Sequence, residues 1–489
     1  MMMSSGFGFG PEQPDDQSPD HQPSDAEPTS GSAETPGTSG NSAAGFDINQ
    51  VFEQMRAMGI PTPELPDHVK DQLNALTAMA QNMFAGGQTQ GGNPFTLPVN
   101  VIRDISRRTL AESGERPVGH LDGDAMKGAL QLAGLWIDAV TALPGADSEA
   151  LDAVVGREAA TRSDWINYSI DGWQSFTTPL VEGIAEAMQR MVDSASGQGI
   201  FGSDESQGNP LGQLIPNLNI SQMMAGFMGT MMRTQLGRSI GKFATTVTSA
   251  HDAAIPLSST QESFLIPENV KAWGEGLGID EREVEIYLAL REVAASRLFK
   301  AAPWLQSHLH SLVSRYGKGI NIDMESMQRQ AEDALSRGEI DPSDPVSMQN
   351  AIAQGVFTPE ESEAQRQALA QLELILALIE GWIDQVVVSS AGDRLASLAR
   401  LQETQRRRRV TQSPTQQLFA SLIGLEVSPR TIRECANFWS YVSQKLTAQE
   451  RDRLWEDPYA LPTVEEISDP ESFLKARTVP DDLSGLGNP

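Results

Sequence analysis

The sequence is poor in the residues that bind transition metals. It contains one cysteine, Cys435, and six histidines among its 489 residues. A single cysteine excludes an intramolecular disulfide and a zinc site built from several cysteines. Cys435 also lies in a helix-like stretch without a neighbouring histidine, which is typical of a small buried apolar residue and not of a nucleophile.

Basic residues are also scarce. The formal net charge is −29, and no lysine or arginine precedes Arg56. Binding to nucleic acid requires a basic face, so no nucleic-acid partner is expected, and binding to anionic lipid is disfavoured for the same reason. The one dense basic run, Arg406, Arg407, Arg408 and Arg409, could engage phosphate, nucleic acid or the acidic tail of the chain itself, but such runs are usually solvated or internally paired.

Targeting signals and long apolar runs are missing from the sequence. The N-terminus has no basic segment followed by an apolar segment, as a secretory signal would. No run approaches the roughly 18 to 20 apolar residues that a membrane span needs. We therefore expect a cytoplasmic protein without a membrane span.

The composition divides the chain into four segments. Residues 1–45 are rich in Pro, Ser, Gly, Asp and Glu, which predicts a disordered acidic tail, interrupted by a possible docking motif at Phe7 and Phe9. Residues 46–92 should form short helices followed by a Gly-rich linker, because glycine disfavours ordered backbone. We expect one helical domain over 93–475 and a C-terminal tail over 476–489.

The domain is predicted to be mainly α, because apolar residues recur at three- and four-residue spacing from Pro98 onward. Asp280 and Glu283 resemble the N-terminal cap of a helix over 281–300, which is apolar on most faces and should be central. Ser163 is predicted to open another helix, and Pro179 the one after it. Methionines and glycines between positions 223 and 241 predict a helix that packs closely on its neighbours.

Several motifs carry a resemblance to a known family. The clearest are Pro267-Glu268-Asn269-Val270, Gly274-Glu275-Gly276-Leu277-Gly278, the stretch from Tyr287 to Phe299, and Leu378-Ile379-Glu380-Gly381-Trp382. Through these motifs the chain between Asn93 and Lys475 resembles the bacterial zincin-like family described as zinc-dependent metalloproteases or hydrolases. The resemblance implies a multi-helix zincin-type scaffold, a bound zinc ion and a peptidase or hydrolase activity.

The chain departs from the zinc motif of such proteins. The motif His-Glu-x-x-His places two imidazoles on one face of a helix, and its glutamate acts as a general base on metal-bound water. Glu292 is present here, but Arg291 stands at the first histidine position and Ala295 at the second. Arginine has no lone pair to offer a metal, and alanine has no donor atom.

The resemblance also implies a third ligand from a later helix that begins with a Glu-Gly pair, here Glu380-Gly381. The position two residues after Glu380 is often histidine in metal-binding members and is Trp382 here. Glu292, Glu380 and Asp384 are thus the remnants of the site. Three carboxylates would suit a hard cation better than zinc, although Arg291 beside them disfavours this.

The remaining histidines do not form a recognisable metal motif. His308 and His310 are two residues apart, which places them on different sides of a helix. They therefore cannot hold one ion as a pair four residues apart can.

Arg291 and Glu292 fall on the predicted central helix and should therefore be buried. An unpaired buried charge costs on the order of several kcal/mol, so both residues need partners. We predict that Arg291 replaces the positive charge of the metal and forms an ion pair with Glu380, with Asp384 nearby.

Two hypotheses about function follow. In the first, the chain is a catalytically degenerate family member without a cofactor, acting as a binding or scaffold protein for a protein or peptide partner. In the alternative, it is an active metal-dependent peptidase or hydrolase, with Glu292 as general base and a metal held by Glu380, Asp384 and a histidine brought in by the fold. The position of the histidines relative to Glu292 separates the two.

Overall fold

The computed structural model describes residues 97–145, 158–197, 220–321 except 259 and 261, 361–412 and 428–477, together with 329, 336 and 337. All of these belong to the second of two units of the chain, Thr89–Pro489. The predicted acidic tail, its Phe7 and Phe9 motif, the segment 46–92 and the tail beyond 477 lie outside the described residues. Their assignments stay predictions.

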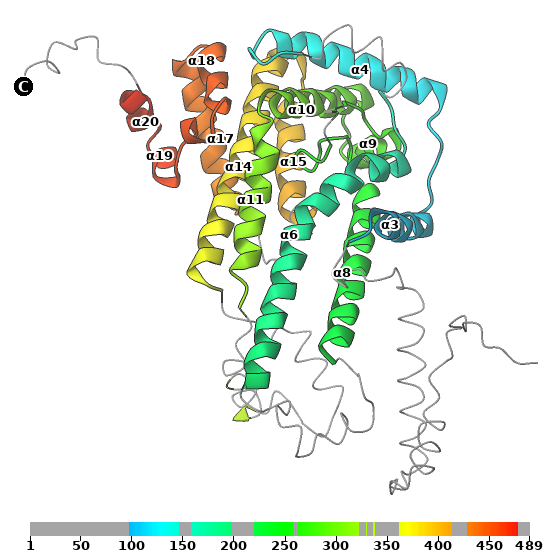
Figure 1. The fold of residues 1–489 in the computed structure, drawn as a ribbon. Helices are drawn as coiled ribbons and strands as arrows, with labels where there is room; N and C mark the ends of the chain where they lie inside the picture. Colours follow the sequence, from blue (N-terminus) through cyan, green and yellow to red (C-terminus); the bar gives the residue numbers. More distant parts are fainter. Residues whose placement is uncertain are drawn as a thin grey trace, which may run out of the picture. The chain divides into compact units, whose positions relative to one another are not determined.

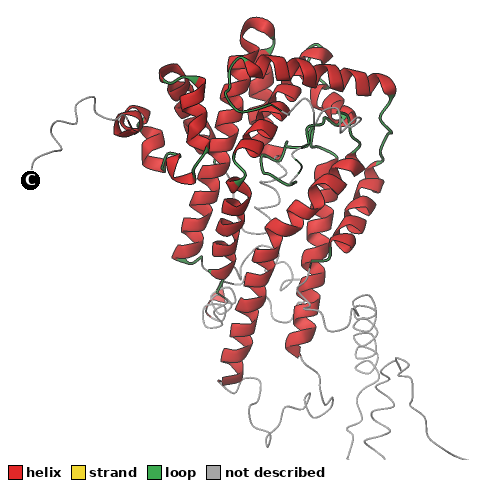
Figure 2. Ribbon diagram, turned by 45° about the horizontal axis from the view of Figure 1, so that its top comes forward, coloured by secondary structure: helices red, strands yellow, loops and turns green. Residues whose placement is uncertain are grey.

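The described part of the chain is helical, with isolated β-bridges at Leu265 but no strands, which confirms the predicted mainly-α class (Figure 2). The longer helices are α3 (Val99–Ser113), α4 (His120–Asp138), α6 (Arg162–Gly197), α8 (Ile220–Ala244), α9 (Pro267–Gly274), α10 (Glu281–Ala301), α11 (Trp304–Lys318), α14 (Glu363–Ala391), α15 (Leu398–Gln412) and α17 (Pro429–Lys445). Short helical segments complete the C-terminal region: η1 (Gly392–Arg394), α18 (Ala448–Asp452), η2 (Arg453–Trp455), η3 (Pro458–Ala460), α19 (Val464–Ser468) and α20 (Pro470–Arg477).

Helix α10 is the central helix, as its apolar pattern predicts. It lies among α4, α9, α14 and α15, which it contacts (Figure 1). Of its 21 residues, 13 are buried. The Asp280 side chain caps its N-terminus by accepting a hydrogen bond from the backbone N–H of Arg282. Glu283 does not complete a capping box, because its carboxylate accepts a hydrogen bond from the backbone of Ser397 instead. The cap is confirmed, and the role predicted for Glu283 is wrong.

Helix α14 carries the Glu-Gly pair in its middle. The helix begins at Glu363 with a capping box between Ser362 and Gln365, so the expectation that a helix begins at Glu380 is wrong. Gly381 is required by packing, since a Cβ atom there would lie 2.9 Å from the backbone nitrogen of Ala436 in α17. The close approach of α14 and α17 accounts for the glycine without any reference to a metal.

The same helix satisfies the length and composition of a membrane span, contrary to our expectation from the sequence. Within the described residues, the segment Glu363–Arg394 is the one that qualifies, and 72% of its apolar window is buried inside the protein. A largely buried apolar helix is typical of the core of a helical domain.

Helix α6 runs unbroken through Pro179, so the prediction that a new helix opens there is wrong. The hydroxyl groups of Thr177 and Thr178 donate to carbonyl groups one turn back, at 2.8 Å in each case. Gly183 then meets Gly317 of α11, where an added Cβ atom would lie 2.3 Å from backbone. Packing on α11 holds the helix together despite the N–H group that proline lacks.

Helix α8 packs closely on α3 through two glycines, as predicted for the methionine-rich segment. A Cβ atom at Gly241 would lie 2.5 Å from the carbonyl oxygen of Ser106, and one at Gly237 would overlap Ile105. Of the methionines whose side chains are described, Met231 is 58% exposed. Close packing therefore depends on the glycines more than on that methionine.

Candidate functional site

Glu292 lies at the centre of the domain and binds a histidine. Its Oε1 atom is 2.7 Å from Nδ1 of His251, and its Oε2 atom accepts a hydrogen bond of 2.9 Å from the backbone N–H of the same residue. The two side chains are 0% and 1% exposed. His251 comes from the connection between α8 and α9, so the fold brings it to α10 across 41 positions of sequence. Both carboxylate oxygens of the general-base candidate are thus occupied by one residue.

Tyr168 of α6 extends this contact on the other side of the imidazole. Its hydroxyl oxygen lies 3.1 Å from Nε2 of His251. Burial, together with the negative charge of Glu292, raises the pKa of Tyr168 above its ordinary value, so the phenol stays protonated at neutral pH. In the neutral tautomer of His251 that donates Nδ1–H to Glu292, Nε2 accepts a hydrogen bond from the Tyr168 hydroxyl. The result is a chain of carboxylate, imidazole and phenol, of which the carboxylate and the imidazole are fully buried.

Arg291 makes the predicted ion pair with Glu380. The Nη2 atom of Arg291 lies 2.5 Å from Oε2 of Glu380, and the two side chains are 8% and 12% exposed. Burial alone would lower the pKa of Arg291, but the negative field of Glu380, with smaller contributions from Tyr287 and Asp384, raises it above its ordinary value. The guanidinium is therefore a permanent positive charge on the face where the motif requires a histidine.

Arg409 of α15 supplies a second positive charge at the same carboxylate. Its Nε atom lies 2.9 Å from Oε1 of Glu380, a charge contact without hydrogen-bond geometry. Its Nη2 atom lies 3.0 Å from Oδ1 of Asp252. Glu380 is therefore shared between two arginines, and Arg409 links it to the segment that carries His251.

The other arginines of the run are internally paired, as the more conservative interpretation of that run predicts. Arg406 lies 3.0 Å from Oδ2 of Asp384, and Arg407 forms an ion pair of 2.7 Å with Glu403. Arg408 donates to the backbone of Trp273 and stacks over its ring. Asp384, whose side chain also accepts from Gln402, is thus oriented toward α15.

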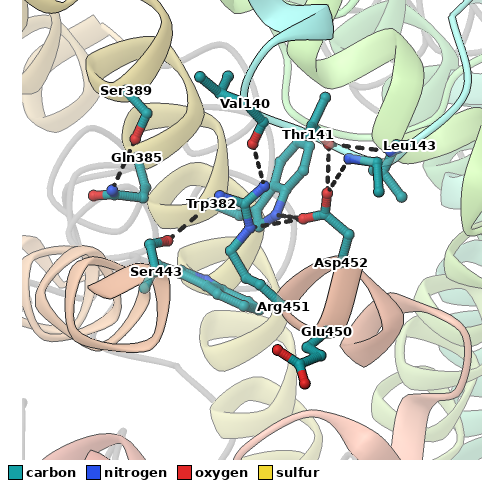
Figure 3. Close-up of polar contacts among 12 residues, drawn as sticks. Val140, Thr141, Leu143, Trp382, Gln385, Ser389, Ser443, Glu450, Arg451 and Asp452 are labelled. Atoms are coloured by element: carbon teal, nitrogen blue, oxygen red, sulfur yellow. Dashed lines mark hydrogen bonds and ion pairs between the residues drawn. The ribbon is translucent and has the colours of Figure 1, made fainter. Parts of the chain in front are cut away.

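Trp382 belongs to a different polar cluster. Its indole N–H donates at 3.2 Å to Oδ1 of Asp452, which also pairs with Arg451 at 2.7 Å (Figure 3). The other carboxylate oxygen of Asp452 accepts from the side chain of Thr141 and the backbone of Ala142. This buried cluster connects α14, α18 and the segment that follows α4, which gives Trp382 a structural role.

A small cavity remains where the motif histidines would project. It is lined by Thr248, Ser249, His251, Asp252, Leu288, Arg291, Ala295, Ile383 and Arg409. Its volume is about 10 Å³, which is room for about one water molecule. Arg291 and Ala295 thus face one shared space, whose volume is far below that of a substrate cleft.

The residues present do not fit a zinc ion. A tetrahedral site needs three or four nitrogen, sulfur or carboxylate donors directed at one point. Glu292 is held by His251, Glu380 by two arginines and Asp384 by α15, so the three predicted remnants do not converge. Over the part of the chain that is described, no three histidine, cysteine or carboxylate side chains are grouped closely enough to hold a metal.

The other candidate residues lie apart from this site. His308 stands beside Trp304 on α11, with ring centroids 5.6 Å apart, and His310 is on the exposed side of that helix. Cys435 is fully buried against α14, which confirms its interpretation as a core residue. Burial raises the pKa of its thiol to about 12.

The comparison with protein families agrees with the resemblance seen in the motifs. The family model of zincin-like metallopeptidases matches residues 99–474, and the chain belongs to that family. No curated protein matches the sequence. Among solved structures, the chain is similar to a proposed hydrolase with a novel fold from Chloroflexus aurantiacus, with 15% sequence identity, a TM-score of 0.49, and coverage of 78% of this chain and 100% of that one.

Sequence reasoning missed three residues of the site. His251 and Tyr168 contact Glu292 and each other through the fold, and no spacing in the sequence marks either of them. Arg409 was considered only as part of a basic run. The one available signal was that a buried Glu292 carboxylate needs a partner. This signal does not indicate which of the six histidines is that partner.

Proposed function

We propose that this chain is a catalytically degenerate zincin-like metallopeptidase, which acts in the cytoplasm as a binding or scaffold protein for a protein or peptide partner. The observation that carries the proposal is the Arg291–Glu380 ion pair of 2.5 Å on the helix face where the family places its metal ligands. A guanidinium cannot ligate a cation and repels one.

The environment of Glu292 supports the same proposal. A general base must reach a water molecule in a productive position. The Glu292 side chain is 0% exposed and both of its oxygens accept hydrogen bonds from His251. The adjoining cavity has room for about one water and none for a peptide bond with its flanking residues.

The experiment that tests the proposal is the metal content of the full-length, untagged protein, measured by plasma mass spectrometry after dialysis against zinc. We expect less than one tenth of a zinc ion per chain. The matched variant is Arg291→His with Ala295→His, which restores two imidazoles on one face and releases Glu380 from one of its arginines. Zinc uptake by this variant and not by the natural chain would support the proposal.

The second candidate is an active metal-dependent hydrolase, and it is favoured by the contact between His251 and Glu292. It requires His251 to turn toward a metal that Glu380 and Asp384 also hold. It predicts about one zinc per natural chain, lost in His251→Ala, and peptidase activity lost in Glu292→Gln. Stoichiometric zinc in the natural chain would therefore overturn the proposed function.

A further inference from the structure

A second, larger pocket lies away from the degenerate site. It is lined by the segment between α3 and α4, the start of α6, and parts of α4, α9 and α10. Its volume is about 150 Å³, and it shares no lining residue with the small cavity beside Ala295. A cavity of about this volume can hold benzene, so the pocket has room for a ligand of about six non-hydrogen atoms.

Arg162 is the most firmly held charged group of this pocket. The residue is 9% exposed, and its Nε atom donates to Oδ1 of Asn269 at 2.8 Å. Its Nη1 atom donates to the carbonyl group of Gly114 at 3.1 Å. The Nη2 atom forms no hydrogen bond with the described part of the protein and is not enclosed by it. Because Arg162 lines the pocket, these remaining N–H donors are available to a ligand there.

The positive charges of the pocket are only partly compensated. Its cations are Arg116, Arg162 and Lys271. Glu268 pairs with both arginines, since its Oε1 atom lies 3.9 Å from Nε of Arg116 and 3.2 Å from Nη1 of Arg162. Lys271 is exposed and forms no ion pair with any described residue. Three cations and one carboxylate leave two positive charges without a partner.

The other carboxylates that line the pocket have no partner either. They are Asp122, Glu281 and Glu285, and none of their side chains forms an ion pair or a hydrogen bond with the described residues. Burial raises the pKa of Glu285, and the charges of Glu281 and Asp122 act in the same direction. Arg282 opposes them with a smaller effect than that of Glu281, and it does not line the pocket. The cations of the pocket are not among the charges that act on Glu285, so the positive and negative groups lie at separate ends.

We infer that this pocket binds a free α-amino acid with a small side chain, whose carboxylate meets Nη2 of Arg162 and whose ammonium group meets Glu281 and Glu285. An amino acid carries separated charges and no net charge, and the lining likewise combines three cations with four carboxylates. A lone anion would leave the three carboxylates without a partner, and a lone cation would leave Arg162 and Lys271 with free donors. Alanine also has the size that the volume allows. This inference does not rest on the proposed function, because it concerns a different part of the domain.

The test is isothermal titration calorimetry of the full-length protein with L-alanine. Two matched compounds each lack one charge: L-alaninamide has no carboxylate, and propionate has no ammonium group. We expect saturable binding of L-alanine and binding at least about tenfold weaker for the other two, because each loses its charged contacts at one end.

Three variants assign the binding to the two ends of the pocket. Glu285→Gln and Lys271→Met each remove one charge, and each should weaken the binding of L-alanine about tenfold. The control is Glu275→Gln, because Glu275 is an exposed glutamate at the end of α9 that does not line the pocket, and it should leave binding unchanged.

Crystals of the natural chain grown with L-alanine provide a measurement that does not depend on the variants. Density for the amino acid between Arg162 and Glu285 supports the inference. Absence of binding, equal binding of L-alanine and L-alaninamide, or unchanged binding in both pocket variants overturns it. Stoichiometric zinc in the same sample would overturn the proposed function and leave this inference standing.

Discussion

Replacing Arg291 by methionine should cost a large part of the stability of the domain. Removing one partner of a buried ion pair costs about 3 to 5 kcal/mol, because the other charge stays buried. Glu380 keeps Arg409 at 2.9 Å, so we expect the lower end, about 3 kcal/mol, which is more than a hundredfold in the folding equilibrium. Methionine fills most of the volume of the arginine stem, so the loss reports the charge and not a cavity.

Urea unfolding of the full chain, followed by circular dichroism at 222 nm, measures this loss as a shift of the midpoint at constant slope. The control is Arg366→Met, which breaks an ion pair with Glu363 whose partners are 58% and 68% exposed and should leave the midpoint nearly unchanged. The double variant Arg291→Met with Glu380→Met should lose less than the sum of its single variants, by about 1 to 3 kcal/mol. Equal midpoints for the Arg291 and Arg366 variants would refute the reasoning.

Three further perturbations follow from the structure. Gly381→Ala places a Cβ atom 2.9 Å from the backbone of Ala436, so we expect a loss of about 1 to 3 kcal/mol in unfolding free energy, and an unchanged urea midpoint would contradict the packing argument. Burial raises the pKa of Cys435 to about 12, so a thiol reagent at pH 8 should label the urea-unfolded chain but not the native one, and rapid native labelling would contradict this. Burial, with the charge of Glu281, raises the pKa of Glu285 above its ordinary value, so the folded state holds that proton more tightly and the contribution of this group to stability is lost as pH rises through its raised pKa. The urea midpoint of Glu285→Gln, measured relative to that of the natural chain, should therefore be higher at pH 7 than at pH 4, whereas parallel profiles would count against the shift.

The sequence predicts the helices better than it predicts their ends. The apolar pattern around Leu288 and Leu298 places α10 in the core, and Asp280 marks its start, because both signals act within a few residues. Pro179 misleads because tertiary packing at Gly183 and Gly317 outweighs a local preference. Gly317 lies more than a hundred positions after Gly183 in the sequence, so the residues around Pro179 do not indicate this contact.

Some contacts of the site could be predicted from the sequence, and others could not. The Arg291–Glu380 pair could be predicted because a buried charge demands a partner and the family resemblance indicated where to look for it. The contacts of His251 with Glu292 and Tyr168 could not, since they depend on the path of an irregular connection between α8 and α9. The residue types show that a buried charge needs a partner, but the fold determines which residue is that partner.

The two arginines at Glu380 could replace the positive charge of a metal ion at this site. A zinc ion carries two positive charges, and Arg291 and Arg409 together supply two within 2.9 Å of one carboxylate. Arg409 also pairs with Asp252, which directly follows His251 in the sequence. The same segment therefore contacts Arg409 through Asp252 and Glu292 through His251. Reverting Arg291 to histidine alone would leave Glu380 paired with Arg409, Ala295 without a donor atom, and Glu292 bonded to His251. On the proposed function, restoring the metal therefore requires at least two substitutions on α10, at Arg291 and at Ala295, which makes the loss hard to reverse one substitution at a time.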